Sequence, residues 1–480
     1  MISNTIKSYK NLSKPVKATL WFTFCNILQK GILFLAVPIY TRIMTTAQYG
    51  VYSVFLSWLE IFEIFGTFRI GWGGYVVGLT KYEDDRDGYT SSMQCLSIVI
   101  TFVTLLLYLL FQNTINKLTG LDTLLTIMIF GLLFTMPAIQ FWSVRERVEY
   151  KYVKLFIVTV TFSLLVLVFG TISGIIFQNK TEAIIFARLI VQGIEGAMLI
   201  WANCHKKFVF FKKEYWKRAF LFNCPLIPYY LSMVVLHSSD RIIINSIVGS
   251  TCAAIYGVAY TLSSCMSIFS SAINQTIQPW LYAKMKAEDV KNVPSTISLT
   301  LVIVAVLNLI LIALAPEVMT IVAPVQYQEA IWIIPPLAAS IVVMFYYQPF
   351  VNVEFYFEES KLTSIASIGV AILNVVLNMI FIPIYGYLAA GYTTVFSYIV
   401  FSICHYMFMK IVCKKNCYNE KLIDMKSSTG ILLLFFIVAA IMMIGYYINF
   451  IRYGFIVIIL VICIMKRNQL IGFFKKMKSR

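Results

Sequence analysis

The chain has 480 residues, of which 60% are hydrophobic and 13% are charged. A mean hydropathy of +0.81 excludes an ordinary soluble globular protein, because its surface would be almost entirely apolar. The net charge of +17 would suit a nucleic-acid-binding protein, but the distribution of that charge along the chain argues against nucleic acid as a partner and for a membrane.

Long apolar runs fill most of the chain. A membrane-spanning helix needs about 20 mostly apolar residues, and we find fourteen such runs, of which the second and eighth are long enough to tilt or break and the last is short. They are 19–40, 49–78, 93–112, 122–143, 155–177, 183–203, 219–240, 252–281, 294–315, 330–352, 362–383, 387–409, 428–448 and 451–465. The sequence therefore predicts an all-α polytopic membrane protein.

Lys and Arg are concentrated in every second connection between these runs. The basic connections lie before residue 18, at 81–86, 145–154, 206–218, 284–291 and 410–426, and after residue 465. The intervening connections contain only Arg42, Lys117, Lys180, Arg241 and Arg452. Cytoplasmic connections carry an excess of Lys and Arg, so we predict that both termini are cytoplasmic. The first run is too long for a signal peptide, and we expect it to be an uncleaved helix.

Known chemical motifs are absent from the sequence. The ten cysteines are scattered and imply no disulfide framework. Cys413 and Cys417, with Cys404 and His405 upstream, lack the spacing of a zinc site and suit a basic loop better. We find no nucleotide-binding or hydrolase motif and no long outward loop for a catalytic domain. We therefore predict no metal, no cofactor and no enzymatic activity.

The first helix carries a lysine deep in its apolar run. Lys30 lies about 11 residues into the helix, or ~16 Å at 1.5 Å per residue, close to the bilayer midplane. A charge at that depth costs roughly 3 kcal/mol and should face the bundle interior or water. One interpretation is an ion pair with Glu60, which lies at similar depth in helix 2 with Glu63 one turn away. The other is a hydrated cavity in which Lys30 meets an anionic substrate.

Two stretches 200 residues apart are weakly similar. YTRIMTTAQYGVYSVF (40–55) and DRIIINSIVGSTCAAIYGVAYTLS (240–263) both have an Arg at a helix end, a polar turn and then Tyr-Gly-Val. Six spans separate them, which predicts two parallel six-helix repeats around a central cavity, as in transporters. We predict an N-terminal lobe at 1–218, a C-terminal lobe at 219–425, and two further helices with a basic tail at 426–480. Arg42 and Arg241 are either interfacial or part of a substrate site.

Two more polar groups stand within predicted helices of the first half. Arg69 lies in GTFRIGWGG, whose glycines predict an unwound or tightly packed segment that exposes N–H groups to phosphate. Arg188, Gln192 and Glu195 are spaced by four and three residues and form one stripe along helix 6. This stripe suits either a substrate pathway or hydrogen bonds between helices.

The second half offers amide side chains in place of charges. Asn274 and Gln278 lie one turn apart in helix 8, and Asn374 and Asn378 do so in helix 11. These amides could contact a glycan, although buried amides also join membrane helices. Pro225 and Pro228 in helix 7, and Pro335 and Pro336 in helix 10, can bend helices. We interpret Glu354 as a solvated helix end.

Several stretches together resemble a known family. QKGILFLAVPIYTRIMTTAQYGVYSVF (29–55), DRIIINSIVG (240–249) and ILNVVLNMIFIPIYGYLAAGYTTVFSY (372–398) resemble Wzx-type polysaccharide flippases of the multidrug/oligosaccharidyl-lipid/polysaccharide exporter superfamily. The resemblance covers most of helices 1 to 12. It implies a bacterial inner-membrane transporter that moves undecaprenyl-pyrophosphate-linked oligosaccharide, such as an O-antigen unit, to the outer leaflet by alternating access. Proteins of polysaccharide assembly would be further partners.

On this interpretation, the candidate residues divide into three groups. The cations Lys30, Arg42, Arg69, Arg188 and Arg241 would bind pyrophosphate. Glu60, Glu63 and Glu195 would be acidic or coupling residues of the cavity, and Gln192, Asn274, Gln278, Asn374 and Asn378 would contact the glycan.

Two alternatives remain. A cation-coupled drug or small-molecule antiporter of the same superfamily would use a carboxylate such as Glu60, Glu63 or Glu195, but the first helix carries a lysine and no acid. A membrane polysaccharide polymerase or ligase would typically have a large basic outward loop, which this chain lacks.

Overall fold

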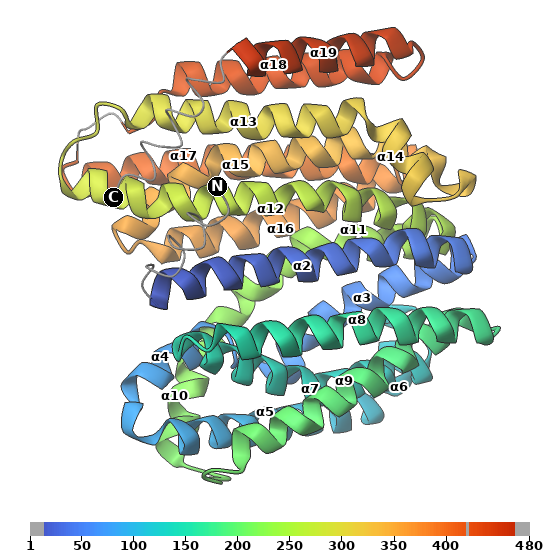
Figure 1. The fold of residues 1–480 in the computed structure, drawn as a ribbon, viewed down its shortest axis with the longest axis vertical. Helices are drawn as coiled ribbons and strands as arrows, with labels where there is room; N and C mark the ends of the chain where they lie inside the picture. The colour runs from blue at the N-terminus through green and yellow to red at the C-terminus, as the bar shows by residue number, and fades with distance from the viewer. Residues whose placement is uncertain (1–13, 419–421, 466–480) are drawn as a thin grey trace, which may run out of the picture. The chain divides into compact units, whose positions relative to one another are not determined.

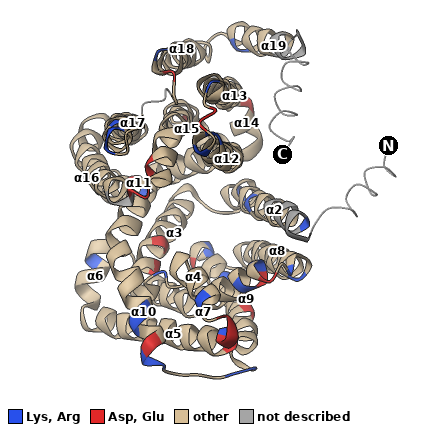
Figure 2. Ribbon diagram, turned by 90° about the vertical axis from the view of Figure 1, so that its left-hand side faces the viewer, with Lys and Arg blue, Asp and Glu red and all other residues tan. Residues whose placement is uncertain are grey.

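A computed structural model describes residues 14–418 and 422–465 (Figure 1). These residues form helices joined by short turns and loops and contain no β-strand, which confirms the prediction of an all-α membrane protein. The predicted basic tail after residue 465 lies outside the described residues. Figure 2 shows that charged residues occupy only short parts of each helix, as expected for a chain whose helices cross a bilayer.

The chain forms two compact units, residues 1–253 and 254–480. The first unit is built from the helices α2 (Lys14–Ile43), α3 (Thr46–Thr67), α4 (Gly73–Lys81), η1 (Glu83–Asp85), α5 (Arg86–Leu110), α6 (Gln112–Thr119), α7 (Thr123–Val148), α8 (Tyr152–Ile176), α9 (Lys180–Cys204), α10 (Lys213–Asn223), η2 (Cys224–Leu226) and α11 (Ile227–Ile247). The first residues of α12 (Ser250–Lys286) also belong to it.

The second unit contains the rest of α12 and the helices that follow. These are α13 (Val293–Ala313), α14 (Ala315–Val322), η3 (Val325–Trp332), α15 (Ile334–Tyr356), α16 (Ser360–Tyr385), α17 (Ala389–Lys415), α18 (Met425–Ile444) and α19 (Asn449–Met465). The predicted lobes at 1–218 and 219–425 were defined as sequence repeats, whereas the two units are defined by their compactness. The lobes therefore stay a prediction.

Twelve helical segments of the described chain are long and apolar enough to cross a membrane. They cover the predicted runs except the second, in α3 and α4, and the fourteenth, in α19, whose apolar part is a shorter helix at Asn449–Ile459. With α3 and α19 counted, the protein has about fourteen membrane helices, as predicted. The eighth run, which was expected to tilt or break, forms one continuous helix of 37 residues, α12, and so does not break.

The predicted second run does break. Helix α3 ends at Thr67, and the next two residues, Phe68 and Arg69, have φ angles of 49° and 45°. This left-handed backbone is unfavourable for residues with a side chain and ends the helix. A series of turns follows, and α4 begins at Gly73. The prediction of an unwound segment around Arg69 is therefore confirmed.

Prolines act differently in the two places where we expected bends. Pro225 lies in the 3-10 turn η2 between α10 and α11, so the predicted run 219–240 does change its helix type there. Pro335 and Pro336 instead occupy the first turn of α15. Their missing N–H groups have no partner to lose at that position, so the expectation that they bend this helix is wrong.

Helix α15 is the central helix of the second unit. Its side chains are buried along nearly its whole length, and it packs against α13, α16, α17 and α18. Figure 2 shows α15 end-on among these neighbours. A helix that is apolar on all sides is buried on all sides, and any polar residue that it carries must find its partner inside the protein.

Candidate functional site

Lys30 projects from α2 and has an exposed side chain. It lies within the candidate span Phe24–Ile43. The expected ion pair with Glu60 is not formed, because Glu60 accepts a hydrogen bond from Ser238 of α11 instead, at 2.5 Å. Within the described part of the chain, Lys30 has no carboxylate at ion-pair distance.

Glu60 belongs to a polar connection between α3 and α11. The Oγ of Ser238, which is fully buried, donates to Glu60 Oε2 and accepts from Nη2 of Arg241 at 3.1 Å. Arg241 is only 8% exposed and lies six residues before the end of α11. The expectation that Arg241 stands at an outer helix end is therefore wrong, because α11 continues past it to Ile247.

The unwound segment after α3 holds Arg69 in a confined setting. Its guanidinium forms an ion pair with Glu63 at 3.1 Å, and the two side chains are only 11% and 12% exposed. The same group lies 4.9 Å from the ring of Trp72 and 5.5 Å from that of Tyr230 in α11. Such cation–π contacts add to the stabilisation of a desolvated charge.

Three backbone N–H groups of this segment are already used by neighbouring groups. The N–H of Arg69 donates to the Thr67 hydroxyl, and the N–H groups of Ile70 and Trp72 donate to carbonyls within the turn. A small pocket beside it is lined by Arg69, Gly71, Ser97 and Gln140 among others. The Arg69 side chain also keeps a donor, since its buried Nε has no hydrogen-bond partner among the described residues. Contact of this segment with a phosphate stays a prediction.

The polar stripe of α9 is present and has two parts. Arg188 Nε donates to Gln192 Oε1 at 2.9 Å, and the guanidinium also interacts with the Tyr52 hydroxyl of α3. Glu195, one turn further, is 5% exposed and forms no hydrogen bond or ion pair with any described residue. A cation with neutral partners and a buried acid without a partner thus share one helix.

Arg42 stands at the end of its helix. It lies in the last turn of α2 and is exposed, and its Nη1 donates to the Pro38 carbonyl at 2.7 Å. Contacts of this kind with the last carbonyls of a helix are typical of interfacial arginines.

The amides of α12 contact neighbouring polar groups within the second unit. Asn274 accepts a hydrogen bond at 2.9 Å from Asn352 in α15. Gln278 donates to the Tyr282 hydroxyl, also at 2.9 Å. Both side chains are half-buried, so each keeps some surface free for a ligand.

Asn374 and Asn378 of α16 are fully buried. Asn374 donates to the Thr394 hydroxyl of α17 at 3.3 Å, Asn378 donates to Asn374 at 3.3 Å, and Asn378 accepts from Thr393. These bonds join α16 to α17, which is the structural alternative considered from the sequence. Contact of these two residues with a glycan stays a prediction.

Glu354 is not a solvated helix end, so that expectation is wrong. It is fully buried in α15 and contacts His405 of α17, with 2.8 Å between Oε1 and Nδ1. Thr363 of α16 donates to its other oxygen at 2.9 Å. The error arose because Glu354 follows the apolar run 330–352 directly, where a polar residue usually marks the end of a span. A histidine inside the run 387–409 was the sequence signal for a buried partner.

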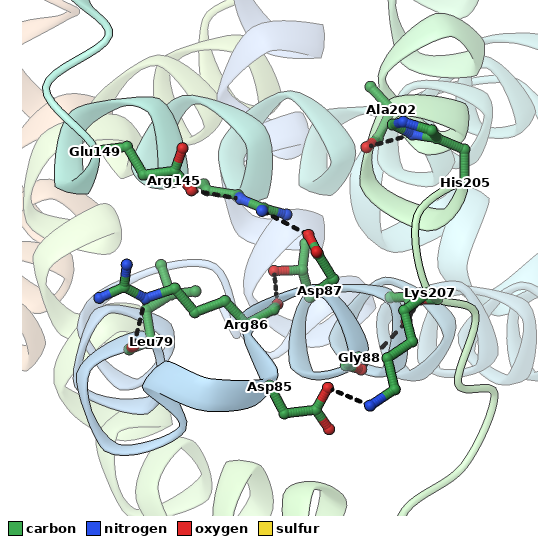
Figure 3. Close-up of polar contacts among 12 residues, drawn as sticks. Leu79, Asp85, Arg86, Asp87, Gly88, Arg145, Glu149, Ala202, His205 and Lys207 are labelled. Carbon is green, nitrogen blue, oxygen red and sulfur yellow. Dashed lines mark hydrogen bonds and ion pairs between the residues drawn. The ribbon is translucent and has the colours of Figure 1, made fainter.

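A network of charges joins three basic connections of the first unit (Figure 3). Asp85 pairs with Lys207 at 2.7 Å, and Arg145 of α7 pairs with Asp87 of α5 and with Glu149. The charge pattern of the sequence predicts these connections on the same side of the membrane but does not identify the pairing. Sequence separation hides such contacts, since Asp85 and Lys207 are 122 residues apart.

Outside the span, this network also sets the proton affinity of Glu149. Burial alone would raise the pKa of this carboxyl, but hydrogen bonds from Lys151 and Arg145 outweigh burial and hold the pKa below its usual value. The same contact with Glu149 raises the pKa of Lys151. Both groups are therefore charged at neutral pH.

Comparison with known proteins gives both a family and a fold. A family model described as "Polysaccharide biosynthesis protein" matches residues 16–285, whereas no curated protein matches the chain in sequence. Among solved structures, the lipid II flippase MurJ in an inward closed conformation aligns with a TM-score of 0.64 at 14% identity, covering 95% of this chain and 100% of that one.

Two further structures have the same fold. An inward-facing multidrug resistance MATE family transporter of the MOP superfamily aligns with a TM-score of 0.59 at 13% identity over 82% of this chain and 96% of that one. A MOP superfamily transporter from Pyrococcus furiosus aligns with a TM-score of 0.53 at 13% identity over 85% and 98%. At these identities the likeness shows the fold alone, but the family model spans more than half of the chain. The chain therefore belongs to the polysaccharide biosynthesis protein family, as the resemblance to polysaccharide flippases implied.

Proposed function

We propose that this protein is a flippase, and not an enzyme, that moves undecaprenyl-pyrophosphate-linked oligosaccharide from the cytoplasmic to the outer leaflet. Membership of a polysaccharide biosynthesis family supports a glycan cargo, and the fold shared with MurJ and MATE transporters supports translocation by alternating access. On this proposal, no covalent bond is made or broken in the cargo.

The observation that carries the proposal is the state of Lys30. This lysine lies in the span Phe24–Ile43 with no acidic partner among the described residues. An intramembrane cation needs water or an anion to offset its desolvation. Arg188, bonded to the neutral Gln192, is in a related situation, and the pyrophosphate of a lipid carrier offers the negative charge that both cations lack.

The remaining residues have distinct proposed roles. Arg69 would meet the pyrophosphate while in exchange with Glu63. Arg42, at the end of α2, would act near the outer leaflet, and Arg241 would act within its span. The half-buried amides Asn274 and Gln278 would contact the sugars. Outward movement of an anionic head group is favoured by an inside-negative membrane potential, worth ~2.3 kcal/mol per charge per 100 mV.

The membrane setting follows from the same proposal. We infer a bacterial inner membrane with both termini in the cytoplasm, because the basic connections alternate with poorly charged ones. Other partners would be the proteins that supply and polymerise the lipid-linked glycan.

Depletion in the host tests the proposal directly. We expect lipid-linked oligosaccharide to accumulate on the cytoplasmic face and surface glycan to be lost. Unchanged lipid-linked glycan on both faces would contradict the proposal. Restoring the depleted cells with variants then tests the charge argument: Lys30→Ala should fail and Lys30→Arg should restore surface glycan. The control is Lys117→Ala, an exposed lysine outside the candidate spans.

One observation favours a second candidate, a cation-coupled antiporter. Glu195 is buried in α9 without a partner among the described residues, and a buried carboxylate of this kind can bind a proton or a metal cation. If depletion leaves the glycan unchanged, efflux of cationic drugs should be measured, with Glu195→Gln as the variant expected to abolish it.

A further inference from the structure

The α9–α11 connection, residues 205–226, combines basic and aromatic side chains and includes the short helix α10. Six Lys and Arg residues and a single acid, Glu214, lie between residues 206 and 218. Phe208, Phe210 and Phe211 lie among them, with 65%, 55% and 56% of their side chains exposed. The proposed substrate pathway assigns no role to this connection.

Hydrogen bonds hold the connection against α5. The Ser91 hydroxyl donates to the Lys207 carbonyl at 2.8 Å and accepts from the N–H of Val209 at 3.0 Å. The indole N–H of Trp216 donates to the Ser92 hydroxyl at 3.1 Å. These contacts fix the path of the chain between α9 and α10, so the neighbouring phenylalanines are held at the surface by a defined backbone.

The anchor points on α5 indicate the depth of the connection in the membrane. Helix α5 has 25 residues and is therefore ~37 Å long, which exceeds the hydrocarbon core of about 30 Å. Ser91 lies five residues after the first residue of α5, Arg86, or ~8 Å along its axis. This level corresponds to the boundary between headgroups and hydrocarbon. In Figure 1, α10 lies at one end of α5 and α7 and runs across their direction.

An aromatic cluster joins the two parts of the connection. The ring of Phe211 meets that of Trp216 edge-on, with 4.9 Å between centroids, and the ring of Phe210 lies 6.2 Å from it. Trp216 is half-buried and bonded through its N–H. A tryptophan with one polar contact and an apolar ring is typical of the interface between membrane and water.

Helix α10 has one face packed on the protein and one face free. Tyr215 and Ala219 are buried and belong to the apolar core of the first unit. Lys213, Lys217 and Leu221 are spaced by four residues on the opposite face, and all three are exposed. A helix with lysines and apolar residues on its free face is suited to lie in the plane of a membrane surface.

The positive charge of the connection is only partly used within the protein. Asp85 pairs with Lys207 at 2.7 Å. Lys206, Lys213 and Lys217 are exposed and form no ion pair with any described residue. An acidic soluble partner such as nucleic acid would match these lysines but would leave the phenylalanines without an apolar contact. Anionic phospholipid offers both a negative headgroup and an acyl chain.

We propose that the α9–α11 connection docks on anionic phospholipids, with its three exposed lysines at the headgroups and its exposed phenylalanines at the acyl boundary. Each lysine near an anionic membrane surface should favour docking about fivefold, and the three together up to about a hundredfold. The inference rests on contacts within the first unit and does not depend on the proposed cargo.

Quenching of a fluorophore by lipid tests the docking. The full-length chain, free of other cysteines, would carry a fluorophore at Phe208→Cys and be placed in nanodiscs that contain phospholipid with a nitroxide near the headgroup. We expect stronger quenching with phosphatidylglycerol present than with phosphatidylcholine alone. Quenching that is equal in the two nanodiscs, or absent from both, would overturn the proposal.

Neutral side chains at the three lysines provide the variant. Lys206→Gln/Lys213→Gln/Lys217→Gln should lose the increase in quenching that phosphatidylglycerol causes. A triple variant that keeps the wild-type increase would refute the role of these lysines. Residues 112–120 belong to a connection with one basic residue, Lys117, and serve as the reference below.

A charge-matched control and a second measurement complete the test. Lys117→Gln/Lys286→Gln/Lys291→Gln removes the same charge at exposed positions elsewhere and should keep the wild-type increase. If the cysteine-free chain does not fold, hydrogen–deuterium exchange of the wild type decides. Phosphatidylglycerol should then slow exchange at residues 206–212 and not at residues 112–120, and equal exchange in both nanodiscs would contradict docking. Because no transport is measured, failure here leaves the flippase proposal untouched.

Discussion

Individual side chains show three ways in which a membrane protein can hold a cation. Arg69 has a carboxylate partner and two aromatic rings. Arg188 has a neutral amide, and Lys30 has no acidic partner within the described chain. The cost of desolvation is therefore offset internally for Arg69, in part for Arg188 and least for Lys30. This ranking makes Lys30 the residue most dependent on an external anion.

The ion pair of Arg69 makes a testable contribution to stability. Arg69→Met leaves Glu63, 12% exposed, as a nearly buried carboxylate without its cation, which should cost about 3–5 kcal/mol. Arg69→Met/Glu63→Gln removes both charges and should be less destabilising. Thermal unfolding of the purified protein measures both. The control is Arg86→Met, whose partner Glu83 is 71% exposed, with an expected effect of at most about 1 kcal/mol. A double variant as unstable as the single one would contradict this.

Gly50 is a second residue with a testable role, because the backbone of another helix packs too closely against it to admit a side chain. A Cβ atom at this position of α3 would lie 1.9 Å from the carbonyl oxygen of Ser250 at the start of α12. Gly50→Ala must therefore displace backbone, and we expect a loss of about 1–3 kcal/mol, typical of overpacking. Gly369→Ala in α16 meets nothing within 4 Å and should be neutral or slightly stabilising. Equal unfolding temperatures for the two variants would refute the packing argument.

At the scale of elements, helix ends are set by local chemistry that is visible in the sequence. Thr45 and Gln48 form a reciprocal capping box at the start of α3, and Gly120, with φ of 66°, ends α6. The turn between α7 and α8 is held by local ion pairs, because Arg145 of α7 and Lys151 of the turn both bind Glu149. This turn should consequently respond to pH.

The lowered pKa of Glu149 predicts the direction of that response. Because its pKa is lower in the folded protein than in the unfolded chain, its contribution to stability is complete above about pH 4.3. The contribution is lost as the pH falls through the lower folded pKa. The difference in unfolding temperature between the wild type and Glu149→Gln should therefore be largest near pH 6 and shrink towards pH 3. Glu288→Gln, at an exposed position, controls for the loss of one carboxylate. A difference that grows on acidification would show that the sign is wrong.

For the whole molecule, composition and apolar run length were enough to predict the helical class and nearly all spans, since a bilayer demands about 20 apolar residues per crossing. Which helix faces and which side chains contact one another could not be predicted in the same way. Helices such as α15 are apolar on every side, so their sequence has no periodicity to indicate which face meets α17. Glu60 bonds to Ser238, 178 residues away, and not to Lys30, because depth in the membrane restricts the choice of partner but does not determine it.

Membrane topology is the whole-molecule prediction that charge alone supports, and it can be checked by thiol labelling. In a cysteine-free variant, single cysteines at Lys117 and Tyr385 should react with an impermeant reagent in intact cells, whereas cysteines at Lys206 and Glu288 should react only after permeabilisation. All four side chains are exposed. Three candidate spans separate 117 from 206, two separate 206 from 288 and three separate 288 from 385. The four sites therefore check one another. If Lys206→Cys were labelled in intact cells, either the predicted topology would be inverted as a whole or one of these helices would not cross the membrane.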